Sequence, residues 1–327
     1  MDKLYLEIYI SNMAKLKALL LTEGMHGMIS QVEGMAKALK VDYYHKRIRL
    51  NFPWKLIPPK LTPISEIVLK DKSYLVNNEV PDLIISCGRK SVIASILFKK
   101  KNPKIFTIHI QDPKVNANNF DYIISPEHDN LKGNNVINSK GAIHYITELE
   151  INNVKGYLTN KVKNQKVVSL ILGGPNKYYK FSNDQLVKIF DKIKSNFTAR
   201  GYFILVIPSM RTPQKIINLA IAEFKSDAHV ISSIDKRAYL SSLALADNIV
   251  VTCDSTSMIS EAAMSGKPIF VAHMKPKRNN YRFKRFFKLF KDMGIIRDLG
   301  DKIESWKYIK LNEAERVAAQ INKQMKN

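Results

Sequence analysis

Hydroxyl groups and a carboxylate lie close together in residues 252–271, TCDSTSMISEAAMSGKPIFV. The apolar pattern predicts a strand, a tight turn, a helix over 257–265 and a second strand. The helix N-terminus would carry hydroxyl and backbone N–H groups, which stabilise anions there, from Ser255, Thr256 and Ser257. Glu261 follows one turn later, where a carboxylate can accept hydrogen bonds from a ribose diol. The segment suits the phosphates and ribose of a nucleotide, and it equally suits a well-capped crossover helix.

Two further loops after predicted strands contain residue types that bind phosphate. Gly173 and Gly174 are expected to expose backbone N–H groups that cradle a diphosphate, and Asn176 adds a side-chain donor. Arg211 follows the next strand and can pair with a phosphate through two parallel hydrogen bonds, while Thr212 is expected to cap the helix after it. The simpler interpretations are a Gly-Pro turn and an exposed arginine beside an ordinary helix cap.

The first half of the chain has its own candidates. Gly24 and Gly27 follow the first predicted strand, where they permit tight turns and close approach of a ligand. Acidic and imidazole side chains follow later strands, and Asp112 and His128 are the candidates for a general base. For either residue alone, a role in a turn or a cap is the simpler interpretation. The spacing matches no metal motif such as HExxH, so no metal is expected.

The elements that must position these residues alternate between strand and helix in two series, separated by a predicted helix and linker over 148–163. This alternation predicts an α/β fold of two doubly wound, Rossmann-like domains with parallel sheets. We expect the domains to span residues 1–155 and 156–327, with a cleft between them and the final helix packing back toward the first domain. Ligands of such sheets bind at the carboxyl ends of the strands, where the loops above are predicted.

The amino-acid composition limits the classes of binding partner that we expect. The chain has 327 residues, 45% of them hydrophobic and 25% charged, which is typical of a globular protein. Its 52 Lys and Arg against 29 Asp and Glu give a net charge of +23 and favour phosphorylated substrates or an anionic membrane surface as partners. Much of the excess is lysine spread along the chain, as a biased genome composition would also produce. No nucleic-acid-binding motif is present, so nucleic acid is not an expected partner.

The cysteines and the N-terminus indicate location. Cys87 and Cys253 are far apart in sequence and form no disulfide framework, which favours a reducing compartment. No apolar run is long enough to span a bilayer, and the N-terminus lacks an uncharged signal core. We expect a cytoplasmic protein, with peripheral contact to the inner membrane as an extension of that hypothesis. Residues 1–12 are expected to be a loosely held extension, with Met13 as an alternative start.

Residues 281–294, YRFKRFFKLFKDMG, predict an amphipathic helix with one aromatic face. The aromatic residues follow helical spacing, at Phe283, Phe286, Phe287 and Phe290. We expect this face to pack on the core. Contact of the basic face, which includes Lys288 and Lys291, with an anionic membrane is a hypothesis.

In combination, these motifs resemble the mitochondrial fission ELM family, from about residue 17 to residue 309. The resemblance rests on the glycines near residue 24, SCGR, IQDP, PEHD, GAIH, LGGP, SMRTP and the 252–271 segment. That family is similar in fold to glycosyltransferases of the two-Rossmann-domain type, GT-B. The resemblance implies that Glu261 holds the ribose and that Gly173 and Gly174 contact the diphosphate. It also implies that the loop with Gly24 and Gly27 faces the acceptor and the donor phosphates, as part of the nucleotide-sugar site. The chain departs from the family pattern at Arg237-Ala238, where Asn-Pro is usual, and at His26 and Met28 in the first loop. That loop is also shorter than the glycine-rich first loop of the transferases.

The function expected from this resemblance is glycosyl transfer from a nucleotide-diphosphate sugar to an envelope or lipid-linked acceptor. No separate cofactor is expected, because the nucleotide sugar is the donor substrate. Asp112 or His128 would deprotonate the acceptor hydroxyl, and Arg211 would stabilise the leaving diphosphate. Two alternatives remain open: a sugar-nucleotide epimerase of the same fold, and a non-catalytic, membrane-associated scaffold.

Overall fold

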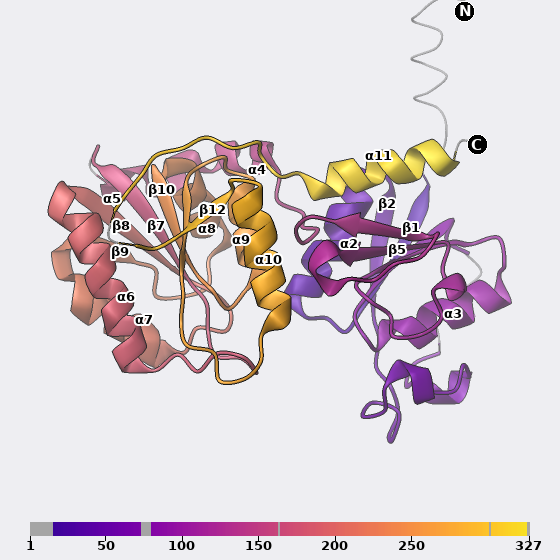
Figure 1. Ribbon diagram of the computed structural model, residues 1–327. Helices are drawn as coiled ribbons and strands as arrows, with labels where there is room; N and C mark the ends of the chain where they lie inside the picture. The colour runs from indigo at the N-terminus through magenta and orange to yellow at the C-terminus, as the bar shows by residue number, and fades with distance from the viewer. Residues whose placement is uncertain (1–15, 73–79, 163, 301, 326–327) are drawn as a thin grey trace, which may run out of the picture. The chain divides into compact units, whose positions relative to one another are not determined.

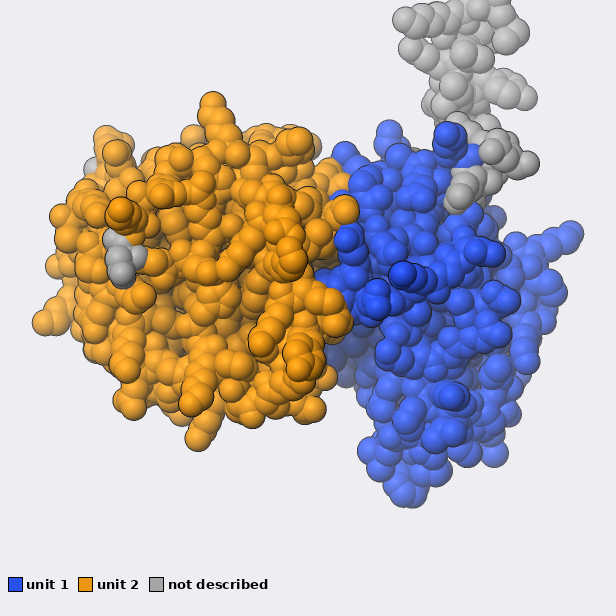
Figure 2. Space-filling model, in the orientation of Figure 1, with its two compact units in different colours: residues 1–139, 143–145, 313–327 blue, residues 140–142, 146–312 orange. Residues whose placement is uncertain are grey.

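The computed structural model describes residues 16–72, 80–162, 164–300 and 302–325, which form two compact units. Figure 2 shows unit 1, residues 1–139, 143–145 and 313–327, and unit 2, residues 140–142 and 146–312. The expected boundary at residue 155 differs from this division, because residues 146–155 belong to unit 2. The expected extension over 1–12 and the alternative start at Met13 lie outside the described residues.

Unit 1 is built on a six-stranded sheet in the order β2-β1-β3-β4-β5-β6, with every neighbouring pair parallel. The strands are β1 Lys17–Thr22, β2 Asp42–Arg47, β3 Leu83–Cys87, β4 Phe106–Ile110, β5 Tyr122–Pro126 and β6 Val136–Ser139. Every residue of β3 is buried, as expected for a parallel strand covered on both faces.

Helices cover both faces of this sheet. They are α2 His26–Ala38, α3 Ser91–Lys101 and α11 Glu313–Met325. Leu20 of β1 packs in the same cluster as residues of α2 and α11, whereas Leu19 and Leu21 pack in the cluster that includes α3. The alternation of side chains along β1 therefore places α2 and α11 on one face and α3 on the other. Figure 1 shows α11 lying along unit 1, although it follows the whole of unit 2 in sequence.

Unit 2 repeats the architecture with strand order β12-β11-β10-β7-β8-β9, again with every pair parallel. The strands are β7 Lys166–Leu172, β8 Tyr202–Pro208, β9 Ala228–Val230, β10 Asn248–Thr252, β11 Ile269–Ala272 and β12 Ile296–Asp298. The helices are α4 Glu148–Asn153, α5 Thr159–Val162, α6 Asn183–Asn196, α7 Gln214–Phe224, α8 Lys236–Leu245, α9 Thr256–Ala263 and α10 Tyr281–Asp292. The expected fold class, two doubly wound α/β units with parallel sheets, is confirmed.

The aromatic face of α10 is buried, as expected from its spacing. Its four phenylalanines are at most 8% exposed and form a chain of ring contacts, from Phe283 to Phe290. Within the part of the chain that the structure describes, no helix is both long and apolar enough to cross a bilayer.

The strand orders place a topological switch point in each sheet, where successive connections leave in opposite directions. In unit 1 the point lies between β1 and β3, and in unit 2 it lies between β7 and β10. Loops at the carboxyl ends of such strands are the usual ligand sites of open α/β sheets. These loops are residues 23–25 and 88–90 in unit 1, and residues 173–182 and 253–255 in unit 2.

Candidate functional site

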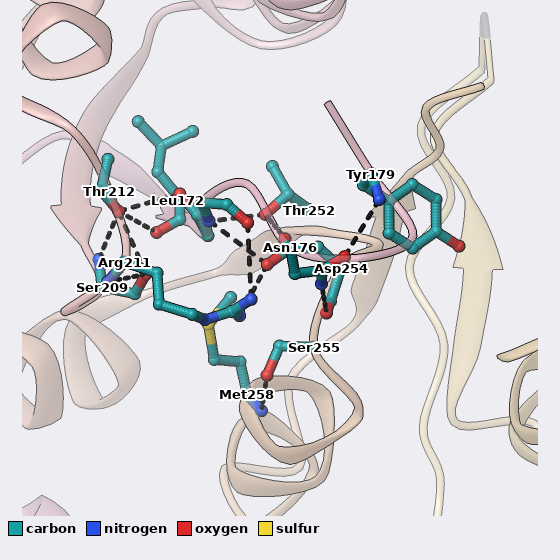
Figure 3. Close-up of polar contacts among 12 residues, drawn as sticks. Leu172, Asn176, Tyr179, Ser209, Arg211, Thr212, Thr252, Asp254, Ser255 and Met258 are labelled. Atoms are coloured by element: carbon teal, nitrogen blue, oxygen red, sulfur yellow. Dashed lines mark hydrogen bonds and ion pairs between the residues drawn. The ribbon is translucent and has the colours of Figure 1, made fainter. Parts of the chain in front are cut away.

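Three loops of unit 2 meet at the carboxyl edge of its sheet (Figure 3). Gly173 and Gly174 follow β7, Arg211 follows β8, and Asp254 follows β10. β7 and β10 are the strands that flank the switch point, and β8 is the other neighbour of β7. The sheet therefore brings together residues separated by up to 81 positions in sequence, 173 and 254.

Asp254 is the centre of this arrangement. Its side chain is fully buried and accepts hydrogen bonds from the Thr252 hydroxyl at 2.7 Å, the Gly174 N–H at 3.2 Å and Arg211 Nη2 at 2.7 Å. Burial raises the pKa of this carboxyl group, while the Arg211 charge and the hydrogen bonds oppose that shift. The carboxylate therefore ties the loops after β7, β8 and β10 to one another.

The two glycines are required by this internal packing. A Cβ on Gly173 would lie 2.0 Å from Asp254 Oδ1, and a Cβ on Gly174 would lie 1.9 Å from the carbonyl oxygen of Arg211. The Gly173 N–H donates to the Thr252 hydroxyl at 2.8 Å and the Gly174 N–H donates to Asp254. The expectation that these N–H groups are exposed to cradle a diphosphate is wrong for this structure, because protein oxygens already accept from both.

Arg211 keeps part of its side chain in solvent. It is 40% exposed, and its Nη1 lies 3.4 Å from the Gly174 carbonyl oxygen while Nη2 binds Asp254. A guanidinium has five N–H donors, so donors remain for an incoming anion. The Asp254 ion pair holds Arg211 over the loop after β7 and would orient it toward a phosphate there.

Replacing Arg211 with methionine tests how far Asp254 depends on this ion pair. We expect Arg211→Met to destabilise the protein by about 1–2 kcal/mol at neutral pH, since the buried Asp254 carboxylate loses a counter-charge that is itself partly exposed to solvent. The loss should shrink as the pH falls and Asp254 becomes protonated. Urea unfolding at pH 5 and pH 7.5 measures both effects. Lys288→Met, which removes the exposed pair with Asp292, is the control and should cost less than about 0.5 kcal/mol. An equal loss in the two variants would contradict the assigned role of Arg211.

The start of α9 provides a second set of anion donors. α9 begins at Thr256, one residue before the predicted start, and its N-cap is Ser255, whose hydroxyl oxygen accepts from the Met258 N–H at 3.3 Å. Helix geometry leaves the first N–H groups, including those of Thr256 and Ser257, without acceptors inside the helix. Both residues are half-buried, so their N–H and hydroxyl groups lie at a partly solvated helix N-terminus. This end of α9 is electrostatically suited to a phosphate.

Glu261 lies on the same helix and is held by a residue of α8. The Tyr239 hydroxyl donates to Glu261 Oε2 at 2.9 Å. The side chain of Glu261 retains some solvent exposure, yet desolvation among protein atoms raises its pKa to about 7, with the Tyr239 hydrogen bond acting in the opposite direction. The carboxyl oxygens of Glu261, near the N-terminal end of α9, can accept hydrogen bonds from hydroxyl groups.

Asn176 and Thr212 shape the loops from within. Asn176 Nδ2 donates to the Asp254 carbonyl oxygen at 3.0 Å, and its Oδ1 accepts from two backbone N–H groups of its own loop. The Thr212 hydroxyl is within 2.9 Å of the carbonyl oxygens of Leu172 and Gly173. The expectation that Thr212 caps the next helix is wrong: Pro213 holds the cap position, and Thr212 fixes the loop after β7 instead.

The glycine candidates of unit 1 lie at the other switch point. Gly24 has a φ of +87°, which favours glycine, and a Cβ there would lie 2.8 Å from Arg47 Nε. Gly27 is the second residue of α2, and no heavy atom lies within 4 Å of a Cβ built on it. Gly24 is therefore constrained by its backbone, whereas the space beside Gly27 is open.

The two candidate bases follow neighbouring strands of unit 1 but differ in access. Asp112 comes after β4 and is half-buried; burial would raise its pKa, but hydrogen bonds from the Lys114 side chain and N–H lower it overall. His128 comes after β5 and is only 3% exposed, with Nε2 3.7 Å from Asp129 Oδ1. The imidazole is therefore not at a solvated surface of unit 1, and Asp112 is the more accessible of the two.

Sequence reasoning missed the roles of Asp254 and Tyr239. From the sequence alone, Asp254 is interpreted as a turn residue, because it lies between a predicted strand and Ser255 at the start of the next helix. Its position after an apolar strand was a usable signal, since polar residues at the carboxyl ends of parallel strands line sites. Tyr239 carries no such signal, because only the packing of α8 beside α9 brings its hydroxyl to Glu261.

Comparison with known proteins gives a consistent assignment. A family model described as Mitochondrial fission ELM1 matches residues 26–325. A Rickettsia prowazekii protein, described as uncharacterized protein RP120, is 29% identical over 340 residues, covering 89% of this chain and 94% of its own. Mitochondrial fission protein ELM1 of Arabidopsis thaliana is 25% identical over 279 residues, covering 75% of this chain and 64% of its own.

Solved structures of the same fold are more distant in sequence. The UDP-GlcNAc 2-epimerase from Methanocaldococcus jannaschii is 14% identical with a TM-score of 0.53, covering 94% of this chain and 99% of its own. S. aureus MnaA, in a co-structure with UDP, is 14% identical with a TM-score of 0.55, covering 95% of this chain and 88% of its own. At this identity the likeness shows the fold alone, which is GT-B-like.

Proposed function

Because this chain belongs to the mitochondrial fission ELM1 family and has a GT-B-like fold, we propose that it is a glycosyltransferase that uses a nucleotide-diphosphate sugar. Unit 2 would bind the donor, and the acceptor would be an envelope or lipid-linked hydroxyl compound. The observation that carries the proposal is that Asp254 holds Arg211 beside the N-terminus of α9, the helix that also carries Glu261.

The donor-binding part of the proposal follows from the chemistry of that site. Arg211 and the α9 N–H groups would bind the diphosphate and stabilise its charge as it leaves the sugar. Glu261, held by Tyr239 through Oε2, would use its other oxygen to accept hydrogen bonds from the ribose. The Gly173–Gly174 loop would serve mainly to hold Arg211 in place, since its own N–H groups donate within the protein.

Deprotonation of the acceptor is assigned to Asp112 in this proposal. Its lowered pKa keeps it ionised at neutral pH, so it can accept a proton, although it is a weaker base than an unperturbed aspartate. His128 is less suited because it is buried.

A ligand panel followed by product analysis tests the proposal. We expect a UDP, GDP, CMP, TDP or ADP sugar to raise the melting temperature in a concentration-dependent way, since a ligand that binds only the folded state stabilises it. UDP sugars are tested first, because a solved structure of this fold is a complex with UDP. Mass spectrometry of the products with a membrane extract should then show transfer of the sugar. Release of an isomerised sugar with no acceptor would favour the epimerase alternative, and no shift with any nucleotide would favour the scaffold.

A further inference from the structure

The segment 52–67 of unit 1 exposes an unusual concentration of large hydrophobic side chains. Between β2 and β3, five of them are 38–73% exposed, namely Phe52, Leu56, Leu61, Ile64 and Ile67. Elsewhere in the described residues, exposed large hydrophobics occur singly or, at Tyr43 and Tyr44, as one adjacent pair. Exposed apolar residues that occur singly need no explanation, but a cluster of this kind indicates an interaction surface.

Hydrogen bonds close the base of this segment, which we call the apolar lobe. Leu50 and Leu69 form an antiparallel bridge, and Asn51 Nδ2 donates to the carbonyl oxygens of Ile67 and Leu69 at 2.9 and 3.2 Å. Arg89 Nη2 also donates to the Lys55 carbonyl oxygen at 2.8 Å. The two ends of the lobe are thus held together, while its five large hydrophobic side chains remain exposed. In Figure 1 the violet segment between β2 and β3 extends away from the strands of unit 1.

The charges around the lobe identify the kind of partner. Residues 49–70 contain four basic residues, Arg49, Lys55, Lys60 and Lys70, and one acid, Glu66. All four basic residues are exposed, and Glu66 forms an ion pair with Lys101. A segment that exposes both large apolar side chains and an excess of cations complements the interface of an anionic bilayer. Two copies of the chain would instead bring like charges together, given the net charge of +23.

We propose that the apolar lobe, residues 52–67, together with Arg49 and Lys70 on either side of it, docks unit 1 onto an anionic phospholipid surface. The aliphatic and aromatic side chains insert at the level of the headgroups, and the cations pair with lipid phosphates. This surface is separate from the basic face of α10, whose phenylalanines are buried in unit 2 and offer no apolar side for insertion. The inference does not depend on the proposed nucleotide site.

Vesicle co-sedimentation of the full chain tests the proposal. We expect binding to phosphatidylcholine vesicles with about 30% phosphatidylglycerol, and weaker binding to phosphatidylcholine alone. Leu56→Ser/Leu61→Ser should reduce binding about tenfold or more. Because both residues are 67–70% exposed, the fold should survive, which circular dichroism checks. The matched control, Ile234→Ser/Ile309→Ser, removes two exposed hydrophobics of unit 2 and should bind as the wild type does.

Charge-reversal variants distinguish membrane binding through the apolar lobe from membrane binding through the basic face of α10. Lys55→Glu/Lys60→Glu should weaken binding to anionic vesicles, whereas Lys288→Glu/Lys291→Glu should leave it unchanged. The proposal would be overturned by a wild type that binds no vesicles, by normal binding of the Leu56→Ser/Leu61→Ser variant, or by loss of binding in the α10 variant alone. If the Leu56→Ser/Leu61→Ser variant still bound vesicles but no longer self-associated, or no longer bound an acidic peptide, the lobe would be a protein-binding surface. That result would also overturn the proposal.

Discussion

Gly174→Ala should destabilise the protein by about 2–4 kcal/mol, the largest stability effect we expect at the site. The added Cβ would lie 1.9 Å from the Arg211 carbonyl oxygen, which is backbone and cannot rotate away. The loops after β7 and β8 would therefore have to separate, and the Gly174–Asp254 hydrogen bond at 3.2 Å would be lost with them. Urea unfolding followed by circular dichroism measures the change, and nucleotide-sugar binding should fall in parallel.

Gly156→Ala is the matched control for this substitution. Gly156 belongs to unit 2, and no heavy atom lies within 4 Å of a Cβ built on it. Its substitution should be neutral or stabilise the protein by up to about 1 kcal/mol, because alanine restricts the unfolded chain. A Gly174→Ala protein as stable as Gly156→Ala would mean that the two loops adapt freely, and the role given to Asp254 packing would be wrong.

The same glycines show how far the sequence alone can be taken. The alternation of strands and helices predicted both sheets, and the polar loops after β7, β8 and β10 lie in contact at one edge of unit 2. The sequence did not show that Asp254 accepts from Gly174 and Arg211, because a contact across 80 residues depends on strand order. A glycine pair looks the same in sequence whether its missing side chains make room for a ligand or, as here, for the protein itself.

The sequence pattern also could not predict how far each candidate side chain is exposed to solvent. His128 and Asp112 occupy comparable positions after neighbouring strands, yet His128 is 3% exposed and Asp112 is half-buried. His128 lies in the short turn Glu127–Asp129 after β5, and its burial is a property of the folded structure that its position after a strand does not indicate. For the same reason the apolar pattern of residues 52–67 did not reveal which side chains remain exposed.

Glu261→Gln should weaken binding of the donor nucleotide sugar by about 100-fold, the largest functional effect we expect. The carboxylate would accept two hydrogen bonds from the ribose diol, and bonds to a charged acceptor contribute about 1.5–3 kcal/mol each. An amide of the same shape offers a single oxygen and no charge. Titration calorimetry with whichever nucleotide sugar stabilises the protein measures the loss. An analogue without ribose hydroxyls should bind both proteins equally weakly.

A lower stability of the folded protein cannot account for weaker nucleotide-sugar binding by Glu261→Gln. Burial raises the pKa of Glu261 from its ordinary 4.5 to about 7, so the folded protein takes up a proton in this range. The contribution of this group to stability is therefore present at low pH and is lost as the pH rises through about 7. Glutamine cannot ionise, so the variant should be no less stable than the wild type at pH 8.

The pH dependence of binding tests the ribose assignment independently. Because the ionised carboxylate is the better diol acceptor, wild-type affinity should rise about tenfold between pH 6 and pH 8, with a midpoint near 7. Tyr239→Phe removes a hydrogen bond that lowers the pKa of Glu261, so its midpoint should move above that of the wild type. The Glu261→Gln protein should show a flat profile over the same range. If the wild type and the glutamine variant gave the same profile and affinity, Glu261 would not contact the ribose, and the nucleotide would have to be placed elsewhere on unit 2.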